Sequence, residues 1–331
     1  MHCMARKAQR SRKLEPAVTR LSFTAPATGT NWIDLSFIAS ALNRRFYRQG
    51  LNWAVAGFQV TVGANQSGSV TFSKIPQTWT AMNSWKKSFA LWNKQQQEAI
   101  EATGGQSGLA KYRDFKIFLN REMVEASAAV DFIQTDATAP ATNQLLLPVD
   151  ADYNLITTGE WEYSEVEIPN NAGAPGVTQG FYLHMLGDSG TTTRPSKGMI
   201  VGYAQSRAYP QSPDPVEGDI GAGWMSTMFD VGMNSEEVID NATDKNDDLP
   251  YAQADYPGTG ANFGGNEVIG YAKINNANGN GFAQNSVQGT NVPCGLIQID
   301  SNLTGTSPYD IIIDLVPGPH RGYLCESMRD V

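Results

Sequence analysis

The chain has 331 residues, of which 41% are hydrophobic and 17% are charged, and its formal net charge is -9. This length permits a sizeable core without requiring two domains, because all-β sandwiches of more than about 200 residues fold as single domains. No window approaches the roughly 18 to 20 consecutive apolar residues of a membrane helix, and no apolar signal-peptide segment follows the N-terminus. The sequence therefore predicts a soluble protein that is not secreted and does not enter a membrane.

The charge is distributed unevenly along the chain. Residues 1–130 carry 17 Lys and Arg against 7 Asp and Glu, whereas residues 131–331 carry 7 against 26. Such an asymmetry bears on electrostatic partners rather than on the fold. It predicts a molecule with two electrically distinct ends, of which one attracts a polyanion and the other repels it.

Residues 1–30 lack a periodic apolar pattern, and residues 24–30 read TAPATGT, which is typical of a hinge. We therefore expect a basic N-terminal arm at 1–30, mostly disordered. Mobile cations can follow an irregular phosphate backbone and release its counterions without reading its sequence. A tail without a partner, or with only a nuclear import signal, is the alternative. The candidate phosphate contacts in the arm are Arg6, Lys7, Arg10, Arg12, Lys13 and Arg20.

A second basic cluster, LNRRFYRQGLNW at 42–53, follows the arm. Arg44, Arg45 and Arg48 complete the set of candidate nucleic-acid contacts. Aromatic residues Phe46, Tyr47 and Trp53 are interleaved with these cations. The pattern predicts that charge and base-stacking surface lie together, as in proteins that bind single strands.

Short apolar or alternating runs bounded by Gly, Pro, Asn and Asp recur along the rest of the chain and predict strands. In 160–168 the alternation slips by one residue, which predicts a β-bulge near Ser164 and Glu165. The runs are 31–40, 53–62, 68–75, 115–119, 144–149, 160–168, 181–186, 199–204, 224–229, 267–274, 294–299 and 309–316.

One segment, 84–105, predicts an amphipathic helix. Trp85, Phe89 and Trp92 recur at helical spacing, and Gly104 and Gly105 supply a stop. We expect this helix to pack over an edge of a sandwich; the alternative is a basic helix that faces nucleic acid.

The second half of the chain has long irregular stretches at 206–223 and 242–266. Loops of this length inside a compact domain are usually functional or make contacts. Many strands, one helix and no internal repeat predict an all-β fold, a single jelly-roll β-sandwich that spans 31–331 and carries acidic surface loops.

Motifs that suggest enzymatic chemistry lack the partners they need. Ser189 lies in LGDSGT at 186–191, but neither His2 nor His184 is placed to act as its general base. The carboxylates Glu160, Glu162, Glu165 and Glu167 are expected to form a solvated strand face rather than a glycosidase pair. We therefore expect no enzymatic activity.

No metal or cofactor site is expected either. The acidic segment 240–248, with Asp240, Asp244, Asp247 and Asp248, lacks the spacing of a calcium loop and is expected to be a plain surface loop, although a bound cation stays open. Three cysteines, Cys3, Cys294 and Cys325, are too few and too scattered for a disulfide framework. We expect the last two to be core thiols.

Three segments resemble the N-terminal half of capsid proteins from small circular single-stranded DNA viruses that encode a Rep protein. They are NRRFYRQGLNWAVAGFQVTV at 43–62, TWTAMNSWKKSFALWN at 78–93 and KYRDFKIFL at 111–119, and the resemblance covers residues 4–120. It implies a single jelly-roll fold, self-assembly into an icosahedral shell, packaging of circular DNA and assembly in or near the host nucleus. The arm is shorter than in many such coats, which leaves open whether the genome is DNA or RNA.

The sequence thus favours a self-assembling capsid protein, with itself and a viral genome, expected to be single-stranded DNA, as partners and the virion as its location. A carbohydrate-binding β-sandwich is the alternative, supported by 7 Trp, 12 Tyr and long polar loops. A hydrolase on a β-sandwich is a third interpretation, which lacks a catalytic pair. The methionine-rich segment 224–233 is expected to be core or an interface anchor between subunits.

Overall fold

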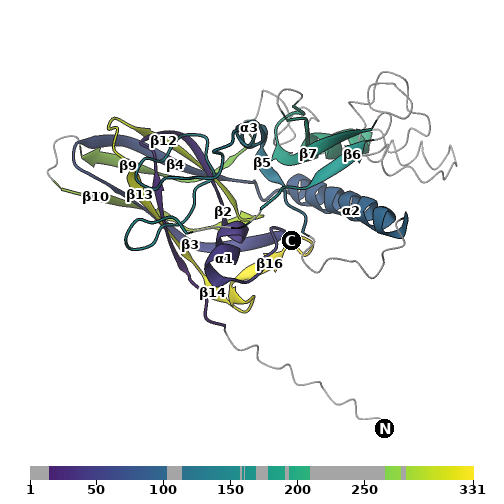
Figure 1. The fold of residues 1–331 in the computed structure, drawn as a ribbon, viewed down its shortest axis with the longest axis horizontal. Helices are drawn as coiled ribbons and strands as arrows, with labels where there is room; N and C mark the ends of the chain where they lie inside the picture. The colour runs from purple at the N-terminus through teal and green to yellow at the C-terminus, as the bar shows by residue number, and fades with distance from the viewer. Residues whose placement is uncertain are drawn as a thin grey trace, which may run out of the picture.

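The structure is a computed structural model that describes residues 15–102, 114–156, 159, 161–168, 178–190, 194–208, 265–276 and 281–331. Within these residues a sandwich of two antiparallel sheets lies beside a second, mixed α/β unit (Figure 1). None of the helices in this part of the chain is both long and apolar enough to span a membrane. The predicted shell domain, 31–331, contains the second unit but omits residues 20–25 and 28–30 of the sandwich.

The first sheet of the sandwich has four strands in one path, and two short strands extend it along β3. Its path is β1 (Arg20–Ala25), β13 (Tyr309–Leu315), β3 (Leu51–Val62) and β10 (Ala283–Gln288), and β11 (Asn291–Pro293) and β16 (Cys325–Ser327) pair with β3. Every pairing in it is antiparallel.

The second sheet is also antiparallel and has four strands. Its order is β2 (Thr28–Asp34), β12 (Leu296–Leu303), β4 (Gln66–Lys74) and β9 (Glu267–Asn276). A two-stranded hairpin of β14 (Pro317–Gly318) and β15 (Gly322–Tyr323) lies near the C-terminus.

Alternation of apolar and polar residues explains why these segments form a sandwich. In β13 the residues Ile311 and Ile313 are fully buried between Asp310 and Asp314, which face outward. The two inner faces meet in one core, where the rings of Phe58 on β3 and Phe72 on β4 stack at 4.7 Å between centroids. The prediction of a mainly β chain with a sandwich-like arrangement is confirmed, whereas the mixed α/β unit described below departs from an all-β fold.

The run 31–40 is not one strand. β2 ends at Asp34, and α1 (Leu35–Asn43) begins directly after it. The Asp34 carboxylate caps the helix by accepting hydrogen bonds from the backbone N–H groups of Ser36 (3.0 Å) and Phe37 (3.1 Å). An aspartate that can cap a helix therefore changes the backbone from strand to helix inside an apolar run.

The second unit is built from the residues between β4 and β9, so it is an insertion into the sandwich. Its sheet has the order β5-β7-β6, with β8 paired to β7 in parallel. Its elements are α2 (Trp79–Ala102), β5 (Phe118–Asn120), α3 (Arg121–Ala126), β6 (Glu165–Ile168), β7 (Gln179–Leu186), β8 (Ser196–Gly198) and α4 (Met199–Ala208).

The predicted helix is confirmed as α2, which begins five residues earlier than expected. The expected packing of this helix over an edge of the sandwich is wrong. The helix packs instead on α4, β6 and β7 of its own unit. Trp85, Phe89 and Trp92 surround Phe115 in the core of that unit. This core joins the sandwich through residues such as Trp32 and Leu296, so the two units share a packed junction.

Other predictions of secondary structure need correction. The described residues contain four helices rather than one, and residues 199–204 lie in α4 instead of a strand. β6 begins at Glu165, so no β-bulge forms at Ser164, and 144–149 makes only isolated bridges.

The arm was predicted too long, because β1 and β2 include residues 20–25 and 28–30. Residues 1–14 and 224–229 lie outside the described residues.

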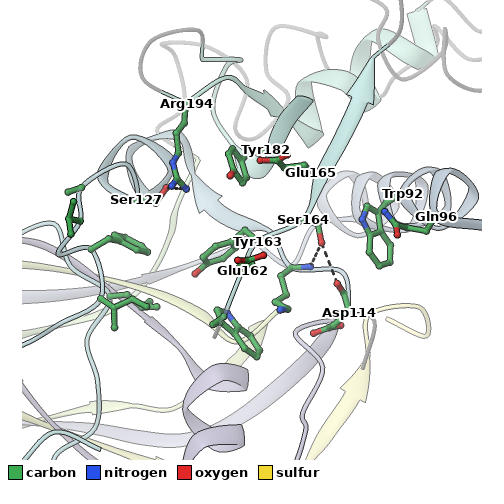
Figure 2. A pocket seen from close by; sticks show the side chains of 17 residues that line it. Trp92, Gln96, Asp114, Ser127, Glu162, Tyr163, Ser164, Glu165, Tyr182 and Arg194 are labelled. Atoms are coloured by element: carbon green, nitrogen blue, oxygen red, sulfur yellow. Dashed lines mark hydrogen bonds between the residues drawn. The ribbon is translucent and has the colours of Figure 1, made fainter. Parts of the chain in front are cut away.

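A cleft of about 760 Å³ opens in the inserted unit (Figure 2). The segment after α3, the segment that leads into β6, and residues of α2 and β7 form its walls. Its volume is typical of a small-molecule site.

Candidate nucleic-acid interface

The structure describes four of the nine predicted contacts: Arg20, Arg44, Arg45 and Arg48. Arg6, Lys7, Arg10, Arg12 and Lys13 lie outside the described residues. The four described arginines occupy two different places, since Arg20 lies on a sheet while the other three follow α1.

Arg20 belongs to the outer surface of the first sheet. Its guanidinium forms an ion pair with Asp314 of β13 (3.6 Å) and donates a hydrogen bond to Gln59 of β3 (3.0 Å). More than half of its side chain is exposed, so the ion pair contributes little to stability. Arg20 is therefore fixed across three strands rather than carried by a mobile arm.

Arg44 and Arg48 are exposed in the turn after α1. Arg44 ends the helix in the left-handed region, with φ of 53°. Gln49, the next residue after Arg48, is fully buried and holds this turn against the inserted unit. The turn thus presents its two arginines from a fixed backbone.

Gln49 makes four hydrogen bonds at the junction of the two units. Its side chain donates to the Asp34 carboxylate (2.9 Å) and to the Ile117 carbonyl oxygen (3.0 Å), and its Oε1 accepts from the Ile117 N–H (2.6 Å). Its backbone N–H donates to the Asp114 carboxylate (3.0 Å). Burial raises the pKa of both carboxyls to about 6.

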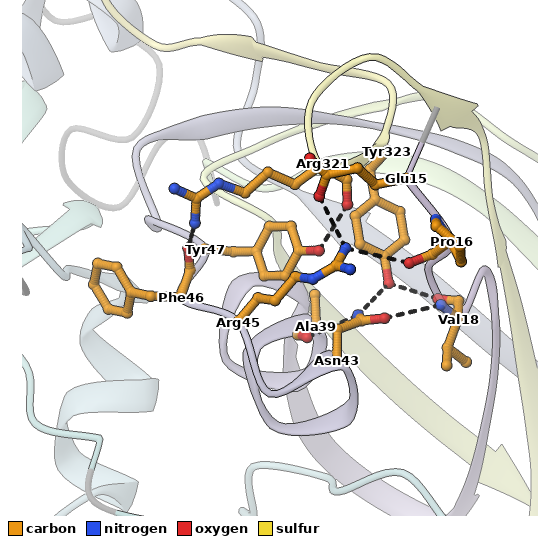
Figure 3. Close-up of polar contacts among 10 residues, drawn as sticks. All are labelled: Glu15, Pro16, Val18, Ala39, Asn43, Arg45, Phe46, Tyr47, Arg321 and Tyr323. Carbon is orange, nitrogen blue, oxygen red and sulfur yellow. Dashed lines mark hydrogen bonds and ion pairs between the residues drawn. The ribbon is translucent and has the colours of Figure 1, made fainter. Parts of the chain in front are cut away.

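Arg45 ties the beginning of the described chain to the sandwich (Figure 3). It forms an ion pair with Glu15 (3.1 Å) and donates to the Pro16 carbonyl oxygen (3.2 Å). These contacts hold residues 15 and 16, which directly follow the basic segment 4–14 in the sequence, against the sandwich. Arg45 thus holds Glu15 and Pro16 beside the turn that follows α1, and about a third of its own side chain is exposed.

A closed ring of hydrogen bonds strengthens the same attachment (Figure 3). The Val18 N–H donates to Asn43 Oδ1 (3.0 Å), Asn43 Nδ2 donates to Tyr323 Oη (2.8 Å), and Tyr323 Oη donates to the Val18 carbonyl oxygen (2.6 Å). Burial raises the pKa of the Tyr323 phenol to about 12, so it stays a donor at physiological pH. We call Glu15, Pro16, Val18, Asn43, Arg45 and Tyr323 the arm anchor.

Arg321 is a further cation beside the anchor that sequence reasoning did not select. Its guanidinium donates to the Phe46 carbonyl oxygen (2.5 Å), and its own carbonyl oxygen accepts from Tyr47 Oη (2.8 Å). It is exposed and adopts φ of 53°. Its separation of more than 270 residues from the basic cluster in the sequence concealed this proximity.

The predicted base-stacking surface is wrong for two of its three residues. Tyr47 and Trp53 are completely buried, and their rings pack on each other and on Tyr323. Phe46 is half-buried. The aromatic residues of this segment thus belong mainly to the core and the arginines Arg44 and Arg48 to the surface, so the segment does not present the predicted base-stacking surface.

The groups considered for catalysis do not assemble into an active site in the described residues. His184 is fully buried, its Nδ1 lies 2.9 Å from the Leu186 carbonyl oxygen, and burial lowers its pKa to about 4. No hydrogen bond joins it to Ser189 among those the structure describes. Glu162, Glu165 and Glu167 are exposed, as predicted, whereas Glu160 lies outside the described residues.

Within the described residues no group of His, Cys, Asp and Glu is arranged to hold a metal ion. The acidic segment 240–248 lies outside those residues. Cys294 is a buried free thiol, as predicted, and Cys325 is a half-buried one.

Comparison with known proteins gives no match: no family model, no curated protein and no solved structure corresponds to this chain.

Proposed function

We propose that the chain is the capsid protein of a small single-stranded DNA virus, which assembles into an icosahedral shell and packages the genome through its basic arm. The observation that carries the proposal is the pairing of the eight sandwich strands. In chain order these are β1, β2, β3, β4, β9, β10, β12 and β13. The first pairs with the eighth, the second with the seventh, the third with the sixth and the fourth with the fifth.

This nested antiparallel pairing, divided over the two sheets of the sandwich, supports a jelly-roll fold. Viral capsid domains and lectins are two of the protein classes that use this fold. The inserted unit joins the fourth and fifth strands and leaves the nested pairing intact.

The arm anchor supports the proposal that the sandwich forms the shell while the basic arm binds the genome. It holds residues 15–18 on the sandwich, and the five cations of 4–14 directly precede it in the sequence. Exposed Arg44, Arg48 and Arg321 lie in the segments that form or adjoin the anchor. Cations concentrated at one end of an acidic chain fit an inner surface that meets nucleic acid without reading its sequence.

Neutralising the arm separates the two parts of the proposal. A variant with Arg6, Lys7, Arg10, Arg12 and Lys13 all changed to Gln keeps the arm's length and the whole anchor. We expect it to form shells of normal size that protect several-fold less nucleic acid from nuclease, because fewer phosphates are neutralised. A control variant with two cations outside the arm and the anchor, Lys94 and Lys273, changed to Gln should package normally.

Undiminished nucleic acid in shells of the neutral-arm variant would contradict the role of the arm. The competing proposal is a carbohydrate-binding protein. If it is right, neither variant forms shells or protects nucleic acid from nuclease.

A further inference from the structure

The cleft in the inserted unit is lined by aromatic side chains whose rings are already held in place (Figure 2). Tyr163 stacks on Phe118 with 3.8 Å between ring centroids, and Trp161 stacks on Phe37 at 5.0 Å. Tyr182 meets the edge of Phe118 at 5.8 Å. A ligand in the cleft would therefore meet a preorganised wall, which reduces the entropy lost on binding.

A cation covers each of two of these rings. Lys116 Nζ lies 4.4 Å from the centroid of Trp161, and the Arg194 guanidinium lies 5.0 Å from the centroid of Tyr182. Arg194 also donates to Ser127 Oγ (3.2 Å) across the cleft. The donors on both cations are thus held beside the aromatic wall.

Two polar atoms of the same wall have no hydrogen-bond partner among the described residues. They are Trp161 Nε1 and Tyr163 Oη, both inaccessible to solvent. A buried donor left without a partner costs on the order of 1–3 kcal/mol, and such groups in native proteins call for an explanation.

The charges in the cleft select the chemical class of that ligand. The lining combines the exposed carboxylates Glu162 and Glu165 and the carboxyl of Asp114 with the cations Lys116 and Arg194. A phosphate or other anion meets the carboxylates, and a cation meets the two bases. A neutral ligand rich in hydroxyl groups gains hydrogen bonds from both signs, since a hydroxyl both donates and accepts.

We propose that this cleft binds a neutral saccharide, with Glu162 and Glu165 accepting hydrogen bonds from sugar hydroxyls, Lys116 and Arg194 donating to them, and Trp161 and Tyr163 forming the apolar wall. The site goes beyond the proposed capsid function and does not depend on it. On a shell it would give the particle a means of attachment to sugars on a cell surface.

The test uses the full-length chain and saturation-transfer NMR with lactose, maltose, mannobiose and chitobiose, and sialyllactose as an anionic comparison. We expect at least one neutral disaccharide to bind more tightly than sialyllactose. Glu162→Gln and Glu165→Gln should each weaken binding about tenfold, the effect of losing one charge-assisted hydrogen bond. Glu167→Gln is the matched control, because Glu167 is an exposed carboxylate on the same strand that does not line the cleft.

Three results would overturn the proposal: no binding of any neutral disaccharide, preferential binding of sialyllactose, or equal affinity of the Glu165→Gln and Glu167→Gln variants. Binding is measured on unassembled and on assembled protein. A failure to form shells therefore bears on the proposed function, whereas a failure to bind sugars in either state bears on the cleft.

Discussion

Asp34 and Asp114 hold Gln49 at the junction of the two units, and both carboxyls are costly to ionise there. Burial is the main cause that raises the pKa of each from 3.8 to about 6, and at Asp34 the Asp114 charge contributes to this rise. Hydrogen bonds from Gln49 oppose this rise at both carboxyls, and the charges of Lys116 and Arg48 also oppose it at Asp114. Between about pH 4 and pH 6 the native state therefore binds more protons than the unfolded state, and the free energy of unfolding falls as pH rises.

Asp114→Asn tests this linkage, because asparagine still offers an oxygen to the Gln49 N–H. We expect the free energy of unfolding of the variant, relative to the original protein, to rise by about 1–3 kcal/mol between pH 4 and pH 7. Urea unfolding at a series of pH values measures it. Asp131→Asn, at an exposed carboxylate, is the control; a difference independent of pH for Asp114→Asn would refute the prediction.

The Tyr323 hydroxyl closes the hydrogen-bond ring of the arm anchor. Tyr323→Phe leaves the Val18 carbonyl oxygen and Asn43 Nδ2 without it, so we expect a loss of about 1–3 kcal/mol in stability and faster proteolysis near residues 15–18. Thermal unfolding and limited proteolysis measure the two effects. Tyr153→Phe removes an exposed hydroxyl that donates to Asp310 and should change stability by less than about 0.5 kcal/mol. Equal effects of the two variants would show that the ring does not hold the arm.

At the scale of elements, α2 completes the edge of the small sheet through one side chain. Gln95 Nε2 donates to the Glu167 carbonyl oxygen (2.7 Å), and the Glu167 N–H donates to Gln95 Oε1 (3.2 Å). Gln95→Ala should speed amide exchange at Glu167 about tenfold. The variant lacks the hydrogen bond between the Glu167 N–H and Gln95 Oε1, so the local opening that permits exchange costs less free energy. Hydrogen-exchange mass spectrometry measures it, with exposed Gln97→Ala as the control. Unchanged exchange in β6 would show that the helix does not hold the edge.

The secondary structure was predictable where alternation of apolar and polar residues was long. β3, β4, β9 and β13 all lie where the sequence predicts them. Residues 199–204 were assigned to a strand, because a short apolar run fits a buried strand and a buried helix equally. In the structure Met199, Ile200, Tyr203 and Ala204 are buried, which is the spacing of one face of a helix. The apolar run was too short for the sequence alone to distinguish this helical spacing from that of a strand.

The candidate interface was predictable only in its local part. The basic clusters at 4–14 and 44–48 are visible in the sequence, but the pairing of Arg45 with Glu15 and the proximity of Arg321 depend on tertiary contacts. Burial of Tyr47 and Trp53 likewise follows from the position of Tyr323, far along the chain. The inserted unit and its cleft also escaped prediction, because their walls come from segments distant in sequence.

At the scale of the whole molecule, the opposite charges of the two parts of the chain and the nested strand pairing lead to one expectation. An acidic chain with a cationic arm should assemble with the arms gathered around nucleic acid, because counterion release favours their contact with phosphate. High salt should weaken packaging before it weakens the shell, since buried contacts are screened less than exposed charges.

The most direct measurement is electron microscopy of the full-length protein after expression, nuclease treatment and sedimentation, together with an assay of protected nucleic acid. The capsid proposal predicts closed particles of uniform size that contain nuclease-resistant nucleic acid, and sensitivity of the extracted material to DNase identifies it as DNA. A monomer without protected nucleic acid at every salt concentration and pH tested would contradict the proposal.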